Sequence, residues 1–191
     1  MGEQPFQVDF PFRGSRDYVH SASLCNEIDR RFPQRERLEL VLRSWMRGRV
    51  AFTPLGAGER GEGAGQAKLR IGGEDRIWTL AEVPSEPGET RVPYDEDGLV
   101  AQDPVTDGRI TCRPHGAGSF FDRLIAANKK LINHTLNPGV KLIAAKVVVD
   151  GAPGPDAPFT LVLASHMGVK IFKSRILIGD SPIGELVYYG G

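Results

Sequence analysis

Hydrophobic positions recur at helical spacing most clearly over residues 119–136. Apolar side chains follow one another there at steps of three and four, which places them on one wide helix face, with Ala127 and Asn128 in the middle turn. Ser119 is the expected N-cap, and Asp122 stands in the first turn, where the helix dipole favours an acid. The pattern ends at three residues that stop a helix, Asn137, Pro138 and Gly139.

Strand patterns follow this helix. Alternation of apolar and polar residues, or short runs of Leu, Ile and Val, predict four strands over residues 141–149, 159–164, 169–178 and 183–189. A loop rich in proline and glycine over 151–158 separates the first two. Residues 179–182, Gly-Asp-Ser-Pro, predict a tight turn between the last two.

The first half of the chain shows a fainter version of the same order. Residues 6–12 predict a strand, and Pro11 indicates that it lies at a sheet edge. Residues 17–32 suit a short helix, residues 38–52 a strand or hairpin, and residues 67–83 further strands.

An internal repeat would account for this order. Residues 18–26 align without gaps to residues 120–128, and residues 69–80 resemble residues 175–186. Duplication is our interpretation, although the identities are few and chance similarity is the alternative. It predicts three segments: a first unit over 1–83, an acidic, proline-rich linker over 84–106, and a second unit over 107–191.

Composition excludes several classes of protein. Lys plus Arg equals Asp plus Glu at 24 each, and this balance argues against a nucleic-acid binder. No apolar run approaches the roughly 20 residues that cross a bilayer, and the first residues do not resemble a secretory signal. The only cysteines, Cys25 and Cys112, are interpreted as small core residues. We expect a cytoplasmic protein that contacts neither nucleic acid nor membrane.

The final stretch, Gly168 to Tyr188, is similar to the paired last strands of acyl-carrier dehydratases. In those enzymes an aromatic and basic strand turns at Gly-Asp or Asp-Gly and returns through small and apolar residues. A strand, a long helix and then about four antiparallel strands is the order found in their superfamily, the hot-dog fold. The resemblance implies an α+β fold with two hot-dog-like units, each an antiparallel sheet curled around one helix.

The resemblance also implies a class of ligand. In this superfamily an acyl chain threads between two units, and its thioester lies near a helix N-terminus, where backbone N–H groups can polarise the carbonyl. The expected partners are acyl-carrier protein or coenzyme A thioesters, in fatty acid or polyketide metabolism, with no cofactor. A homo-oligomer stays open.

Dehydratases of this superfamily pair a histidine with a carboxylate on the helix of the partner unit. The residues that match by position are His115 and Asp122 around the second helix, and His20 and Glu27 around the first. Pairing His115 with Glu27, or His20 with Asp122, would suit general acid–base catalysis, because imidazole titrates near neutrality. The family's His-Phe-Pro turn and Pro-Gly helix entry are not intact, so the alternative is that both histidines are ordinary surface or helix-edge residues.

Arg13 and Arg16 stand at the expected start of the first helix. They are candidates to bind the phosphate of coenzyme A or of a carrier-protein arm. The alternative is a capping turn in which Ser15 or Asp17 is the N-cap.

Other motifs carry less chemistry. Residues 56–61 match Gly-x-Gly-x-x-Gly, but no helix follows, so we interpret them as a flexible loop and not as a dinucleotide site. His134 and His166 are interpreted as structural, and the four histidines give no metal signature.

The sequence therefore predicts a protein that processes acyl thioesters, as a 3-hydroxyacyl dehydratase or a thioesterase. The alternative is a non-catalytic acyl-binding or assembly protein on the same scaffold, and a β-rich interaction domain unrelated to acyl groups is a third. Whether the chain is an enzyme stays open.

Overall fold

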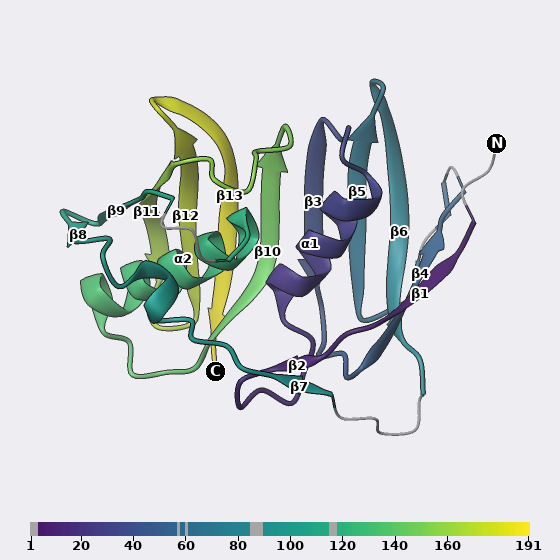
Figure 1. Cartoon of the computed structure of the whole chain (residues 1–191), viewed down its shortest axis with the longest axis horizontal. Coiled ribbons are helices and arrows are strands. Elements are labelled where there is room, and N and C mark those ends of the chain that lie inside the picture. The colour runs from purple at the N-terminus through teal and green to yellow at the C-terminus, as the bar shows by residue number, and fades with distance from the viewer. Residues whose placement is uncertain (1–3, 57, 60, 85–89, 115–117) are drawn as a thin grey trace. The chain divides into compact units, whose positions relative to one another are not determined.

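The chain divides into two compact units, residues 1–94 and 95–191. The computed structural model describes residues 4–56, 58–59, 61–84, 90–114 and 118–191 (Figure 1). Unit 1 contains, in chain order, β1 (Phe6–Asp9), β2 (Phe12–Arg13), α1 (Ser21–Arg31), β3 (Arg37–Leu42), β4 (Arg49–Pro54), β5 (Gly65–Ile71), β6 (Glu74–Glu82) and β7 (Arg91–Val92). Unit 2 contains η1 (Gly98–Val100), β8 (Val105–Thr106), β9 (Arg109–Cys112), α2 (Phe120–Leu136), β10 (Leu142–Asp150), β11 (Phe159–Met167), β12 (Ile171–Ile178) and β13 (Ser181–Gly190).

The main sheet of each unit is antiparallel, which confirms the α+β expectation. In unit 1 the strands lie in the order β1-β4-β6-β5-β3, and β2 pairs separately with β7 in parallel. In unit 2 the order is β10-β13-β12-β11-β9-β8. β1 is the outermost strand, as Pro11 after it suggested. β3 and β4 do not pair with each other, so the hairpin considered for residues 38–52 does not form.

The described part of the connection between β4 and β5 passes close to β6 in unit 1. β4 and β5 are both antiparallel to β6 and flank it, so they run parallel to each other and cannot be joined by a tight turn. Glycines permit the close approach. A Cβ added at Gly61 would lie 1.7 Å from Thr79 Cγ2, and one at Gly63 would lie 2.6 Å from the Leu80 carbonyl oxygen. Gly61, the last residue of the motif that we interpreted as a flexible loop, and the neighbouring Gly63 therefore permit close approach to a strand.

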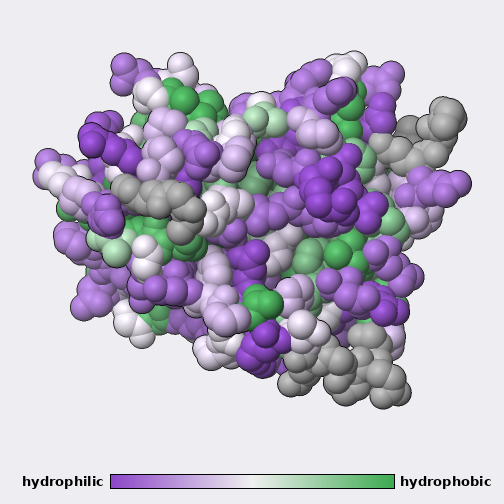
Figure 2. Space-filling view, in the orientation of Figure 1, coloured by the Kyte–Doolittle hydropathy of each residue, from purple (hydrophilic) through white to green (hydrophobic). Residues whose placement is uncertain are grey.

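Helix α1 lies against the sheet of unit 1 (Figure 1). Its buried residues are Ser21, Ala22, Ser23, Leu24, Cys25 and Ile28. At its end the ring of Phe32 contacts that of Trp78 on β6 at 4.9 Å, and the guanidinium of Arg31 lies 3.8 Å from the ring centre of Phe6 on β1. The outer side of this helix is hydrophilic (Figure 2), as expected of a helix with one buried face.

Helix α2 confirms the sequence prediction at both ends. Ser119 is the N-cap, and Asn137 ends the helix in left-handed geometry at φ 41°. Every residue from Phe120 to Asn128 is buried, and the buried hydroxyl of Tyr188 on β13 donates to the carbonyl of Ile125 at 2.8 Å. The helix is thus enclosed within its own unit and hydrogen-bonded to the sheet.

The segment expected as a linker, 84–106, contains β7, η1 and β8 in its described part. Lys130 on α2 donates hydrogen bonds to the carbonyls of Val100 and Asp103 at 2.6 and 2.8 Å. Part of this segment is therefore bound to the helix of unit 2. Over the described residues, neither helix has the length and apolar composition needed to span a bilayer.

Candidate functional site

The start of α1 is not closed by a side chain. His20 is the N-cap and adopts the extended backbone that a cap requires, but no side-chain hydrogen bond caps the helix. The first turn holds no acidic residue. The expectation that Ser15 or Asp17 would be the N-cap is wrong, because the helix begins later than residue 17. The positive end of the helix dipole is consequently not offset by its own sequence.

Basic side chains gather beside this helix start around the ring of Tyr94. The guanidinium carbons of Arg13 and Arg16 lie 5.0 and 5.3 Å from the ring centre of Tyr94. The His20 and Tyr94 ring centres are 5.3 Å apart. We call Arg13, Arg16, His20 and Tyr94 the Tyr94 cluster. Each cation–π contact is worth about 0.5–1 kcal/mol where solvent has access.

Arg91 holds the loop that carries the cluster. Its Nη1 donates to the carbonyls of Gly14 and Arg16 at 2.6 and 2.8 Å. Gly14 has φ +57°, a conformation that favours glycine. The pairing of β2 with β7 brings Arg13 and Tyr94 together, although 81 positions separate them in the chain. Two guanidinium groups and an open helix start suit a phosphate, a carboxylate or a developing oxyanion.

The start of α2 is closed. The side-chain oxygen of Ser119 accepts a hydrogen bond from the backbone N–H of Asp122, and the Asp122 carboxylate accepts one from the backbone N–H of Ser119 at 3.0 Å, forming a capping box. The Ser119 hydroxyl also donates to this carboxylate at 2.8 Å. The Asp122 carboxylate is buried and occupied by its own helix.

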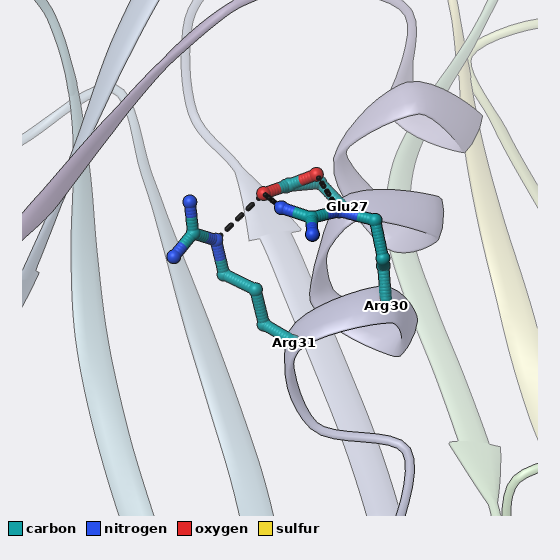
Figure 3. A network of polar contacts seen from close by, with 3 residues as sticks. All are labelled: Glu27, Arg30 and Arg31. Atoms are coloured by element: carbon teal, nitrogen blue, oxygen red, sulfur yellow. Dashed lines mark hydrogen bonds and ion pairs between the residues drawn. The ribbon is translucent and has the colours of Figure 1, made fainter.

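Glu27 on α1 is largely buried and binds two arginines (Figure 3). Its carboxylate accepts hydrogen bonds from Arg30 at 2.7 and 2.9 Å and from Arg31 at 2.6 Å. The bond from Arg30 lowers the pKa of the Glu27 carboxyl, Arg31 acts in the same direction, and partial burial opposes both. Glu27 is thus held ionised, which suits an ion pair better than a proton donor near neutrality.

The expected histidine–carboxylate pairs join residues of different units. His115 lies outside the described residues, so the pair of His115 with Glu27 has no geometry to report. His20, the N-cap of α1, and Glu27 on the same helix are seven positions apart, which is about two helical turns. The structure therefore brings His20, Arg13 and Arg16 together in one cluster and leaves Glu27 in a separate ion pair.

Other chemistry receives little support. Burial, and secondarily Asp103, raises the pKa of the Cys112 thiol far above its ordinary range, which keeps it protonated and poorly nucleophilic. Among the described residues, no three His, Cys, Asp or Glu side chains are grouped so as to hold a metal ion. His134 lies in the last turn of α2, where a cation complements the dipole.

Sequence reasoning missed Tyr94 and Arg91. Both lie in the segment interpreted as a linker, and no local pattern shows that this segment returns to β2. It also passed over Asn128, whose amide is fully buried on α2. A polar residue surrounded by apolar positions on a helix face was the available signal for Asn128.

Comparison with known proteins gives similarity in structure alone. No protein-family model and no curated protein sequence matches the chain. A protein from Thermobifida fusca assigned as a thioesterase II aligns with a TM-score of 0.55 and 12% identity, over 100% of this chain and 93% of that one. A hot-dog protein of unknown function from Alicyclobacillus acidocaldarius aligns with a TM-score of 0.50 and 8% identity, over 100% and 94% of the two chains. The dehydratase domain of PpsC from Mycobacterium tuberculosis, solved with C12:1-CoA, aligns with a TM-score of 0.50 and 14% identity, over 98% and 93%.

Proposed function

The chain has the hot-dog fold, and on that premise we propose that it binds acyl thioesters of coenzyme A or of an acyl-carrier protein and processes them. The reaction is hydrolysis of the thioester or reversible loss of water from a 3-hydroxyacyl group. The observation that carries the proposal is the start of α1, where an uncapped helix end lies beside Arg13 and Arg16.

Each part of a thioester has a matching group at this site. The guanidiniums bind the phosphate of the pantetheine arm or of coenzyme A through charge-assisted hydrogen bonds. Backbone N–H groups at the open helix start polarise the thioester carbonyl and stabilise the oxyanion that forms on it. The His20 imidazole at the N-cap acts as general base and then as general acid, because the ordinary pKa of a histidine lies near neutrality.

We further propose that the two units are copies of one hot-dog plan, with a first copy over 1–83, a linker over 84–106 and a second copy over 107–191. Each unit has two strands, then a helix, then four main strands in chain order. In unit 2, the last strand, β13, lies between β10, which follows the helix, and the remaining strands. In unit 1, the last strand, β6, is separated from β3, which follows the helix, by one strand, β5. Similar strand order along the chain supports descent from one duplicated segment.

One observation favours a second candidate, a non-catalytic acyl-binding protein. The carboxylates of Asp122 and Glu27, which were the expected partners of the histidines, are held by contacts within their own helices. A binding protein needs the Tyr94 cluster and the open helix start but no acid–base pair. The two candidates differ in turnover and not in ligand class.

Measurements of binding and of turnover by the full chain test both candidate functions. Calorimetry with octanoyl-CoA measures binding, release of free thiol measures hydrolysis, and loss of the enoyl absorbance of octenoyl-CoA measures hydration. We expect binding by the wild type and loss of turnover in His20→Ala. His134→Ala, on the exposed end of α2, is the matched control, and His115→Ala tests the histidine outside the described residues.

The outcomes separate the candidates. Turnover that disappears in His20→Ala and survives in His134→Ala supports the enzyme. Binding without turnover in the wild type supports the non-catalytic protein. Failure of octanoyl-CoA and octanoyl-carrier protein to bind at all would refute both candidate functions.

A further inference from the structure

The turn between β11 and β12 exposes apolar side chains. Among the described residues, four large hydrophobic side chains are exposed, and three of them lie at this turn or beside it. Met167 at the end of β11 is 67% exposed, Val169 in the turn is 48% exposed, and Tyr189 near the end of β13 is 49% exposed. Exposed apolar side chains that gather in one place indicate a contact surface.

The strand pairing joins these side chains into one patch. Ile171 on β12 pairs with Met167 on β11 on one side and with Tyr189 on β13 on the other. Directly opposite residues have Cβ atoms about 5 Å apart, so these three form a row across three strands. Val169 stands in the turn two positions before Ile171. We call Met167, Val169, Ile171 and Tyr189 the turn patch.

Backbone contacts hold the turn against β13. The N–H of Lys170 donates to the carbonyl of Met167 at 3.1 Å, and the N–H of Gly190 donates to the carbonyl of Lys170 at 3.0 Å. A Cβ added at Gly190 would clash with the carbonyl oxygen of Val169, so the glycine permits this close approach. The exposed side chains therefore project from a turn fixed beside the end of the chain that is marked C in Figure 1.

Positive charge surrounds the turn patch. The sequence has no acidic residue over 159–179, whereas Lys170, Lys173 and Arg175 lie within this stretch, and all three are exposed. Lys173 lies two positions after Ile171 on β12 and therefore on the same face of the sheet. The chain as a whole carries no net charge, so the β11–β12 hairpin has a local positive excess that the overall composition conceals.

From this combination we propose that the turn patch binds the surface of an anionic lipid membrane. Met167 and Val169 enter the headgroup layer, and Tyr189 lies at the boundary between headgroups and acyl chains, where tyrosine is favoured. Lys170 and Lys173 contact the lipid phosphates and carboxylates. A projecting turn suits a fluid layer without a fixed shape, whereas a protein partner would have to offer a matching pocket.

A second copy of the chain fits the turn patch less well. In a two-fold dimer the same patch lies on both protomers, so the lysines around it would face an equally basic surface. Anionic headgroups offer the opposite charge. The proposal departs from the expectation, drawn from overall charge and the lack of a long apolar run, that the chain contacts no membrane. It does not depend on the proposed function.

Co-sedimentation of the full-length protein with lipid vesicles tests the proposal. The probes are vesicles of phosphatidylcholine alone and of phosphatidylcholine with phosphatidylserine. We expect the wild type to bind the anionic vesicles about tenfold or more tightly than the neutral ones, and added salt to weaken the binding. Lys170→Gln with Lys173→Gln should bind the anionic vesicles about tenfold more weakly, because each lysine near an anionic surface adds several-fold to the affinity.

The matched control for charge is Arg109→Gln with Arg113→Gln. Both arginines are exposed and lie on or directly after β9, which pairs with the other end of β11. This variant removes the same charge as the lysine variant, and we expect it to bind the anionic vesicles as the wild type does.

Two further variants test whether the apolar side chains enter the lipid. Met167→Ser with Val169→Ser keeps the charge and should bind the anionic vesicles about tenfold more weakly, because less apolar surface leaves water. Met167→Cys accepts an environment-sensitive fluorophore at the new thiol, since both native cysteines are buried. Its emission should shift to the blue on anionic vesicles. Asp180→Cys, in the turn at the other end of β12, is the control and should show no shift.

Several outcomes overturn the proposal. The turn patch does not bind membranes if the wild type fails to bind anionic vesicles, if both turn variants bind as the wild type does, or if both fluorophores shift equally. A wild-type dimer in analytical ultracentrifugation that dissociates in Met167→Ser with Val169→Ser, without vesicle binding, would assign the patch to a second copy. Thermal unfolding checks that the variants fold, and Met167→Ser alone replaces the double variant if that one does not.

Discussion

Each unit has a helix followed by four strands of its main sheet, but the units differ in how the second and third of these strands connect and in how the helix begins. In unit 2, β11 and β12 form a hairpin closed at Met167 and Ile171, and α2 starts with a capping box. In unit 1, the described part of the connection between β4 and β5 passes close to β6, and α1 starts without a side-chain cap. In unit 2 the strand connection and the helix cap are thus both formed by residues close together in the chain, whereas unit 1 has neither feature.

The largest change in stability is expected where the connection between β4 and β5 passes close to β6. Gly63→Ala is expected to lower the free energy of unfolding by about 2 kcal/mol, because the new Cβ would meet the backbone carbonyl of Leu80. Urea unfolding followed by circular dichroism measures the change. Gly154→Ala is the control, since a Cβ there meets nothing within 4 Å. Equal stability of the two variants would mean that the segment does not pass close to β6.

The capping box of α2 comes next. Ser119→Ala is expected to lower the free energy of unfolding by about 1 kcal/mol, because a backbone N–H at the helix start loses its acceptor. Asp122→Ala should cost a similar amount. The double variant should cost less than the sum, since both side chains share the same bonds. Additive losses in thermal and urea unfolding would contradict a reciprocal box.

Closing the start of α1 tests its role in binding. His20→Asn introduces a side chain that readily caps a helix, whereas His20→Ala removes the imidazole without adding a cap. We expect octanoyl-CoA to bind His20→Asn about threefold more weakly than His20→Ala, because the cap competes with the ligand for the same N–H groups. Calorimetry measures both affinities. If the asparagine variant binds at least as tightly as the alanine variant, the open start does not take part.

The smallest effect concerns the outer face of α1. Glu27→Gln is expected to lower the free energy of unfolding by about 0.5 kcal/mol at neutral pH, a typical value for ion pairs at the protein surface, because both arginines remain partly exposed. The folded state lowers the pKa of Glu27 below its ordinary value of 4.5, so the ion pairs stabilise above that pH. Their contribution is lost as the pH falls through the lower folded value. Urea unfolding of both proteins from pH 7 to pH 3 should therefore show the difference in stability decrease below pH 4.5, and a constant difference would refute this account.

Local patterns predicted the helix cap and the last turn of unit 2 because both depend on residues close together in the chain. Ser119 and Asp122 lie three residues apart and form the cap that their sequence indicates. The turn at 179–182 joins β12 to β13 as expected. Both features depend on neighbours in the chain, which is the information that periodicity and turn residues contain.

Unit 1 and the candidate site depended on distant contacts. The order of β4, β5 and β6 across the sheet depends on the connection between β4 and β5, and glycines alone do not distinguish a close approach from a loop. The sequence identified Arg13, Arg16 and His20 as candidates. It did not show Tyr94, because the pairing of β2 with β7 spans most of the unit. The buried state of Asn128 likewise depends on the sheet that faces it.

The strand order has a consequence for synthesis on the ribosome. Within unit 1, β6 separates two pairs, β1 with β4 and β3 with β5, and it is the last strand of the sheet to be translated. Within unit 2, β13 stands between β10 and β12 and is also the last. A nascent chain that stops before Ser181 leaves β10 without its partner in that unit. Each sheet therefore closes only when its final strand emerges, so a premature stop anywhere in the last strand exposes two incomplete edges to aggregation.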